Sequence, residues 1–209
     1  TWVNSIALSS GNDKSRTYVS YSNTSGNGIL RDNRLNRHNL TLRQTAKYLN
    51  DKLNIDANVN IINQNLHNPP MSGFQATQLY GLYGFPRGLD MTPYKSYEKF
   101  DSVRNVITQN WPFITASNQN PYWVANKNLF DNKRNRTLIN LAVKYDFTDW
   151  LNLQVRGNMD RTNDVNTKKY YVGTAVAYGG PNGGYNLLNR TTTEYYGCLL
   201  YTSDAADEE

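Results

Sequence analysis

Two histidines are the first residues in this chain that could bind a metal or transfer a proton. His38 and His67 lie 29 positions apart, and no cysteine lies near either of them. A zinc site draws on closely spaced Cys and His ligands, and this spacing does not supply them. We therefore predict no metal ligand here and expect His38 to form a hydrogen bond at a strand end.

The other candidates for chemistry are a carboxylate pair and a glycine-rich segment. Asp160 and Asp164 lie beside Arg161 and Asn163, a setting that favours a solvated charge cluster over an acid–base pair. Residues 179–184 (GGPNGG) carry no lysine and lack a strand–glycine–helix context, so they predict a flexible loop and no phosphate cradle. We thus predict no catalytic residue, no cofactor-binding residue and no enzymatic activity.

Aromatic side chains in the long segment 64–134 are the remaining candidates for ligand binding. Flat apolar rings can contact sugar rings or peptide side chains. Long ordered loops also need internal packing, and we consider packing the better-supported role for these rings. The same segment predicts a short helix over residues 75–83, with Ser72 marking its start. The candidate substrate-contact or lid-contact residues are Tyr80, Tyr83, Phe85, Trp111, Tyr122 and Trp123.

Composition limits the class of fold that could position these residues. The chain has 209 residues, with 38% hydrophobic residues, a mean hydropathy of −0.71 and 30 asparagines, which is too polar for a conventional core of this size. Aromatic residues reach 12%, which is too many for a solvated, disordered chain. No apolar run approaches the ~20 residues of a transmembrane helix. A polar β-protein, soluble or of the outer-membrane type, fits these values.

The last twelve residues, 198–209, resemble the translation of a sequencing adapter, and we interpret them as a non-native tail. Without this tail the net charge rises from +5 to +9, because four acidic residues leave with it. The only cysteine, Cys198, leaves as well, so residues 1–197 offer no disulfide and no catalytic thiol. The basic residues are scattered and not clustered, which argues against a nucleic-acid partner.

Strict alternation of apolar and polar residues predicts antiparallel strands. The clearest window is 53–61, and residues 139–147 and 151–159 repeat the pattern. A weaker copy covers residues 39–48. Two further strands are indicated by the pairs Ile6/Leu8 and Val19/Tyr21. In all, we predict about seven strands.

The connections between these strands alternate in length. Short turns are expected at 11–14, 49–52 and 148–150, and long loops at about 25–36, 64–134 and 163–188. Short turns at one end and long loops at the other are typical of an outer-membrane barrel, whose strands cross the membrane with about 9–11 residues. A soluble antiparallel sandwich also has alternating strands, and the pattern leaves that alternative open.

Several segments resemble the SusC/RagA family of TonB-linked outer-membrane transporters from Bacteroidetes. The resemblance covers residues 1–197, and its motifs are specific in combination. These segments are LYGFPRG (82–88), QNWP (109–112), NPYW (120–123) followed by NKN (126–128), YDFTDWL (145–151), GNDK (11–14) and RHNL (37–40).

The resemblance implies a fragment of a large transmembrane β-barrel with long extracellular loops, located in the outer membrane. It further implies active import of oligosaccharides or peptides, driven through TonB and assisted by a SusD-like surface lipoprotein. The plug and the TonB-contacting region of that family lie outside this sequence. A soluble carbohydrate-binding β-sandwich and a passive outer-membrane porin are the alternative functions.

Overall fold

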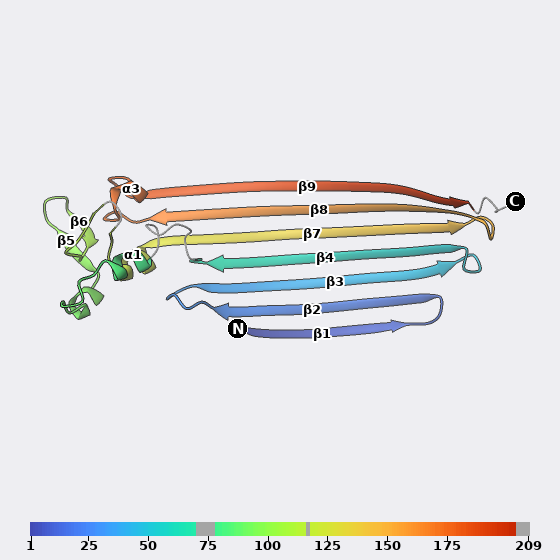
Figure 1. The fold of residues 1–209 in the computed structure, drawn as a ribbon, viewed down its shortest axis with the longest axis horizontal. Coiled ribbons are helices and arrows are strands. Elements are labelled where there is room, and N and C mark those ends of the chain that lie inside the picture. Colours follow the sequence, from blue (N-terminus) through green and yellow to red (C-terminus); the bar gives the residue numbers. More distant parts are fainter. Residues whose placement is uncertain (70–77, 116–117, 204–209) are drawn as a thin grey trace, which may run out of the picture.

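The protein has an all-β fold built on one large antiparallel sheet, seen in a computed structural model (Figure 1). The structure describes residues 1–69, 78–115 and 118–203. Across the sheet the strands lie in the order β1-β2-β3-β4-β7-β8-β9, and each is hydrogen-bonded to the next. The seven strands are β1 (Trp2–Gly11), β2 (Ser15–Asn27), β3 (Arg34–Tyr48), β4 (Leu53–His67), β7 (Asn128–Asp146), β8 (Leu151–Tyr170) and β9 (Gly184–Ser203). The prediction of about seven antiparallel strands is confirmed.

The strands are longer than alternation alone indicated, and the loops are correspondingly shorter. The three long connections span residues 28–33, 68–127 and 171–183, against expected ranges of about 25–36, 64–134 and 163–188. The expected ranges were too wide because alternation marks only the part of a strand that has one apolar face. Beyond that part both faces are polar, and the pairing continues without a hydrophobic period.

All three long connections lie at one end of the sheet, and the three short turns lie at the other (Figure 1). The short turns join β1 to β2, β3 to β4 and β7 to β8, as expected. In the β3–β4 turn, Leu49, Asn50 and Asp51 adopt φ values of +54°, +55° and +68°. Left-handed backbone is costly for a leucine and cheaper for Asn or Asp, so Leu49 is the strained member.

One face of the sheet carries a zone of mainly apolar side chains, which we call the apolar band. The cross-strand register aligns its members in rows; one such row is Leu42, Val59, Ile139 and Met159. On β4 the band runs from Leu53 to Ile61, about 26 Å along the strand. Its members are Ile6, Leu8, Val19, Tyr21, Leu40, Leu42, Ala46, Tyr48, Leu53, Ile55, Ala57, Val59, Ile61, Ile139, Leu141, Val143, Tyr145, Leu153, Val155, Met159, Tyr195, Leu199 and Tyr201.

The same face becomes polar toward the long-loop end, in two successive rows that we call the amide belt. Asparagine is the commonest residue in both rows, and neighbouring amides pair across strands: Asn63 donates to Asn135 at 2.5 Å, and Asn163 donates to Asn189 at 2.9 Å. The belt residues are Trp2, Asn4, Asn23, Ser25, Asn36, His38, Asn63, Asn65, Lys133, Asn135, Asn163, Val165, Asn189 and Thr191.

The opposite face of the sheet is mainly polar and charged, and we call it the polar face. Asn58, Asn140 and Asn158 lie side by side in one of its rows. Ion pairs between strands cross this face, including Arg43 with Asp56. The register places Ile55, Val59, Val143 and Val155 on one face and Asn58, Lys144 and Arg156 on the other, as alternation of apolar and polar residues along a strand predicts.

No second layer covers the large sheet within the described residues, and its apolar side chains, apart from Ala46, are exposed or partly exposed. Ala46 is the one sheet residue among the buried apolar side chains. The other buried apolar residues (Trp111, Trp123, Val124, Ala125 and Ala175) belong to the long connections. The packed core of the described chain thus lies beyond the end of the sheet. None of the described helices combines the length and apolar character needed to span a membrane.

Residues Cys198–Ser203, interpreted above as part of a non-native tail, form the end of β9 and pair with residues 151–156 of β8. They complete the register that β9 shares with β8 and do not form a separate element. Residues 204–209 of the same tail lie outside the described residues.

Candidate functional site

The long connections fold together at one end of the sheet into a small unit that we call the loop cap. It contains α1 (Gln78–Tyr83), the 3-10 helix η2 (Thr92–Lys95), the hairpin of β5 (Glu98–Asp101) and β6 (Val106–Gln109), α2 (Pro121–Lys127) and α3 (Val176–Gly179). The helix expected over residues 75–83 is present as α1 from Gln78 onward, and its expected beginning lies outside the described residues. All six candidate aromatic residues lie in the loop cap.

Two of the six candidates, Phe85 and Trp111, meet in an aromatic cluster. Their ring centroids are 5.2 Å apart, and both rings also contact Tyr94 and Phe113. The indole nitrogen of Trp111 donates to the side-chain oxygen of Asn118 at 3.0 Å. Trp111 is only 6% exposed. This cluster therefore packs the loop against itself, and Phe85 offers the more accessible ring.

Trp123 is a core residue of the loop cap. It is 1% exposed, and its indole nitrogen donates to the hydroxyl of Thr174 at 3.0 Å. That hydroxyl in turn donates to the side-chain oxygen of Asn128 at 2.8 Å. Trp123 consequently joins the 68–127 connection to the 171–183 connection, and its ring is closed to any ligand.

The three tyrosine candidates lie on the helices α1 and α2. Tyr83 is 74% exposed, whereas Tyr80 and Tyr122 are half-buried. The two helices pack closely: a Cβ added at Gly81 would lie 2.1 Å from the carbonyl oxygen of Gln119. Among the six candidates, Tyr83 therefore offers the most accessible ring for an external contact.

A buried network of amide side chains holds the loop cap together. Asn120 is fully buried, accepts from the backbone N–H of Tyr122 as the N-cap of α2, and donates to the carbonyl oxygens of Tyr94 and Asn110. Gln109 donates to the Gly173 carbonyl and accepts from the Asn120 backbone N–H. The role of Asn120 has a sequence signal, because Asn followed by Pro is typical of a helix start. Gln109 belongs to the segment QNWP (109–112) singled out above, but its local sequence gives no sign of its role in this network.

The base of the loop cap is fastened to the sheet where β4 ends and β7 begins. Asn68 exchanges hydrogen bonds with Phe130: the Asn68 N–H donates to the Phe130 carbonyl, and the Asn68 side chain accepts from the Phe130 N–H. The Asn68 carbonyl accepts from the side chain of Asn33, in the 28–33 connection, at 2.9 Å. The cap is thus anchored through backbone groups that end the β4–β7 ladder.

His67 lies in an acidic clasp beside this anchor. Its Nδ1 is 2.6 Å from an oxygen of Asp131, and its Nε2 is 3.5 Å from an oxygen of Asp32. Asp32 also pairs with Arg34, and this pairing, chiefly its hydrogen bond, holds the pKa of Asp32 below its ordinary value. The clasp joins the 28–33 connection to β4 and β7.

Charge pairs also fix the outer part of the loop cap. Lys127 Nζ lies 2.6 Å from Glu98 and 4.9 Å from the ring centroid of Tyr171. The hydrogen bond to Glu98 is the main reason why the pKa of Lys127 is raised. The pKa of Asp90 is lowered, first by a hydrogen bond from the Thr92 backbone.

The remaining candidates from the sequence have structural partners. His38 forms the expected hydrogen bond, with the Tyr21 hydroxyl at 2.7 Å, but it lies inside β3 and not at a strand end. Asp160 and Asp164 also lie inside β8, where they pair with Arg136 and Arg134 respectively. The two carboxylates therefore serve two separate cross-strand ion pairs.

Residues 179–184, predicted as a flexible loop, form a packed turn between α3 and β9. The side chain of Arg104 donates to the Pro181 carbonyl. Gly183 has a φ of +81°, and an added Cβ would lie 2.6 Å from the Tyr170 carbonyl oxygen. The glycines are needed here for a tight backbone approach.

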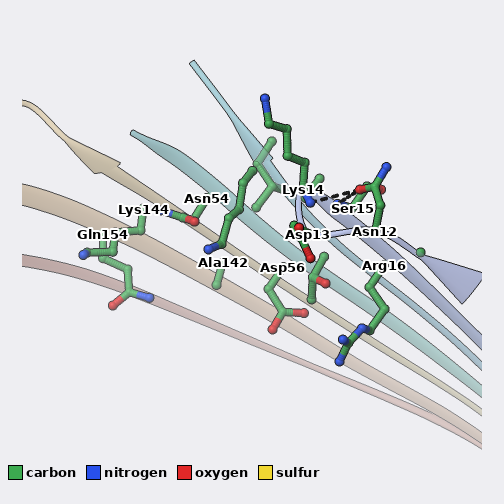
Figure 2. A pocket seen from close by; sticks show the side chains of 15 residues that line it. Asn12, Asp13, Lys14, Ser15, Arg16, Asn54, Asp56, Ala142, Lys144 and Gln154 are labelled. Carbon is green, nitrogen blue, oxygen red and sulfur yellow. Dashed lines mark hydrogen bonds between the residues drawn. The ribbon is translucent and has the colours of Figure 1, made fainter. Parts of the chain in front are cut away.

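The polar face is hollowed near the short turns, where a space of about 770 Å³ lies beside the β1–β2 turn (Figure 2). Arg16 and Asp56 project to the same side, whereas Lys14 extends away from them (Figure 2). Further along this face, the side-chain oxygens of Asn39, Asn58 and Asn60 are shielded and accept no hydrogen bond. These three acceptors are buried among neighbouring side chains and are closed to an external ligand in this structure.

Within residues 1–69, 78–115 and 118–203, no three His, Cys, Asp or Glu side chains are grouped so as to hold a metal ion. A scan against protein-family models and a search of curated proteins gave no match for this chain.

Proposed function

We propose that this chain is a section of the wall of an outer-membrane transport barrel, with the apolar band facing lipid and the polar face lining the lumen. One observation carries the proposal: a single-layer antiparallel sheet has an uncovered band of mainly apolar side chains on one face and a polar opposite face. A membrane-spanning barrel uses such a sheet, because lipid covers its outer face and water fills its interior.

The dimensions of the apolar band support this assignment. Its nine positions on β4, Leu53 to Ile61, match the ~9–11 tilted residues that cross a bilayer. Tyr48 and Tyr145 lie in the row of Leu53 at the short-turn end, and Phe147 and Trp150 follow in the β7–β8 turn. Tyrosine and tryptophan favour the membrane–water interface, where one side of the ring meets lipid and the other meets water.

The proposed transport activity follows the resemblance to SusC/RagA transporters. In this proposal, the full-length barrel imports an oligosaccharide or peptide with energy supplied through TonB. The loop cap then lies outside the cell, where it meets a SusD-like lipoprotein, and the polar face lines the substrate path.

A soluble β-sandwich is less well supported by the described residues. A sandwich buries the apolar face of one sheet against a second sheet ~10 Å away. Here the second sheet is the two-stranded β5–β6 hairpin, and it belongs to the loop cap at the end of the strands. The apolar band therefore has no protein partner among these residues.

Quenching by lipid tests the proposed membrane wall. The chain, in a Cys198→Ser background, is refolded into phosphatidylcholine vesicles with a fluorophore on a single introduced cysteine. Leu141→Cys places the fluorophore on the apolar band, and the neighbouring Asn140→Cys places it on the polar face. A lipid with a nitroxide in mid-chain should quench the label at 141 several-fold more than the label at 140. Equal, weak quenching at both positions would contradict the proposal that the sheet forms part of a membrane barrel wall.

Energy dependence separates active transport from a passive porin. Cells that express the full-length gene are assayed for uptake of labelled oligosaccharides and peptides, with and without an uncoupler of the proton gradient. Active transport predicts uptake that stops when the gradient collapses. Uptake that continues unchanged would favour the porin and leave the wall assignment intact.

A further inference from the structure

We infer that a hollow on the polar face binds an acidic sugar, one that carries a carboxylate or a sulfate group. The inference rests on the proposed function, because it takes the polar face as the side of the sheet along which the substrate passes. The hollow has a volume of about 580 Å³ and shares Arg16 and Thr45 with the space shown in Figure 2. Its volume lies within the range of about 300–1,000 Å³ that is typical of small-molecule sites.

Tyr18 gives this hollow an aromatic ring on which a sugar can stack. It is 37% exposed, and it lies between Ser9 of β1 and Arg43 of β3 in one row of the sheet. The hydroxyl groups of Ser9 and Thr45, which also line the hollow, have no hydrogen-bond partner among the described residues. Each of them can donate and accept, as the hydroxyl groups of a sugar do. A partly exposed ring beside free hydroxyl groups suits the apolar face and polar rim of a sugar.

Arg16 supplies the charge that selects an acidic sugar. It lies two residues before Tyr18 on the same face of β2, about 7 Å along the strand, so that one ligand can reach both side chains. Its guanidinium has no hydrogen-bond or ion-pair partner among the described residues. Arg43, by contrast, donates to both oxygens of Asp56, at 3.1 and 2.6 Å, and is neutralised. The free guanidinium of Arg16 can therefore form two parallel hydrogen bonds to an oxyanion.

The charge of the whole polar face favours the same class of ligand. Along the strands this face carries ten lysines and arginines but only five aspartates and glutamates. A surface with an excess of one sign raises the local concentration of ligands of the opposite sign. The space next to the hollow has the same excess of positive charge. Its charged lining residues are Lys14, Arg16, Lys47, Lys144, Asp13 and Asp56.

The test measures the affinity of the full 209-residue chain for three ligands, in a non-ionic detergent without a sugar headgroup. The ligands are a galacturonate trimer, the galactose trimer of the same linkage and a glutamate tripeptide, and equilibrium dialysis gives each Kd. We expect the galacturonate trimer to bind about tenfold more tightly than the galactose trimer, the scale of one charge-assisted hydrogen bond. Equal binding of the two sugars would overturn the inference. So would equal binding of the tripeptide and the galacturonate trimer, because the site would then select charge and not sugar.

A matched pair of arginine variants locates the selecting charge. Arg16→Gln should remove the preference for galacturonate over galactose. Arg156→Gln removes the same charge from the same face, on β8 and outside the hollow, and should keep the preference. An unchanged preference in Arg16→Gln, or an equal loss in both variants, would contradict the assigned site.

Substitutions of Tyr18 test stacking independently of charge. Tyr18→Ala should weaken the binding of both sugar trimers several-fold, and Tyr18→Phe, which keeps the ring, should recover most of this loss. Unchanged binding in Tyr18→Ala would remove the sugar from the inference. The comparison of the two trimers on the unmodified chain needs no variant, so it decides the matter even where a variant does not fold.

The lipid-quenching experiment separates this inference from the proposed function. A chain whose labels at 141 and 140 are quenched as expected, but which binds the two trimers equally, would overturn the acidic-sugar site and leave the membrane wall standing. A chain that fails the quenching test would instead remove the proposed function, and with it the inference.

Discussion

At the scale of single residues, burial separates aromatic side chains that the sequence treats alike. Trp111, Trp123 and Tyr83 all lie in a long polar segment and are equal candidates by residue type. Only the packed structure distinguishes them, because whether a ring is buried depends on segments distant in sequence. Trp123, for example, contacts Thr174 from another connection. Packing was favoured over ligand contact for these rings, and Trp111 and Trp123 fit that preference.

Replacement of Trp123 by alanine should destabilise the loop cap. The buried ring and its hydrogen bond to Thr174 are lost, which for a large core aromatic costs about 3–5 kcal/mol. Limited proteolysis of the 68–127 connection should become markedly faster. Tyr83→Ala is the control, since the exposed Tyr83 ring should contribute within about 0.5 kcal/mol. Equal proteolysis of both variants would contradict the assigned core role.

Acidification should release the 28–33 connection from the clasp. Arg34 and His67 lower the pKa of Asp32, so the stabilisation is complete above the unfolded pKa of about 3.9 and is lost as pH falls through the lower folded value. Hydrogen exchange in residues 28–33 should accelerate below about pH 4. Asp32→Asn should exchange fast at every pH, whereas Asp149→Asn, in a turn at the other end, should behave as wild type.

At the scale of elements, the register of β7 and β8 decides which substitutions the sheet tolerates. Leu141 lies in the middle row of the apolar band, and Val155 lies one row closer to the short turns. Arg156 follows Val155 in sequence and lies on the polar face. Adjacent residues on one strand should therefore respond in opposite ways to a change of charge.

Leu141→Arg should reduce membrane assembly most, Val155→Arg less, and Arg156→Leu least. An arginine facing lipid at the midplane costs about 2–4 kcal/mol, and less toward either interface. Refolding yield into phosphatidylcholine vesicles measures the order. If Arg156→Leu were the most damaging of the three, the faces of the sheet would be reversed, as a slip of one residue in register would cause.

The sequence predicts the strands where one face is apolar and fails where both faces are polar. On β4, alternation marks residues 53–61, but the strand continues to His67 through the belt residues Asn63 and Asn65. The buried network of the loop cap is also hidden from the sequence. Its hydrogen bonds join residues such as Gln109 and Gly173, which no local pattern connects.

At the scale of the whole molecule, the sheet has two open edges and no core beneath it. The outer edges of β1 and β9 leave backbone N–H and C=O groups unpaired, and exposed strand edges associate readily with other chains. Water is a poor solvent for the apolar band, which in a barrel is covered by lipid. The isolated sheet therefore needs other molecules to cover its apolar band and to pair the backbone groups of its edge strands.

The chain should aggregate in plain buffer and stay dispersed in detergent. Detergent covers the apolar band, many of whose side chains are exposed to solvent. Analytical ultracentrifugation of residues 1–197 with and without detergent measures this difference. A monodisperse monomer that melts cooperatively in plain buffer would contradict the membrane wall and favour the soluble sandwich.

The β4–β7 ladder has a consequence for the order of folding. Five of the six strand pairings in the large sheet close over short or moderate connections, whereas β4 and β7 pair across residues 68–127. Closing this loop costs only about 2.4 kcal/mol more entropy than closing a four-residue turn, because the cost grows with the logarithm of length. The hairpins β3–β4 and β7–β8 should form first, and their docking should be the slow step. Once docked, the ladder tolerates inserts of very different length, so the loop cap can be exchanged without redesigning the strands that carry it.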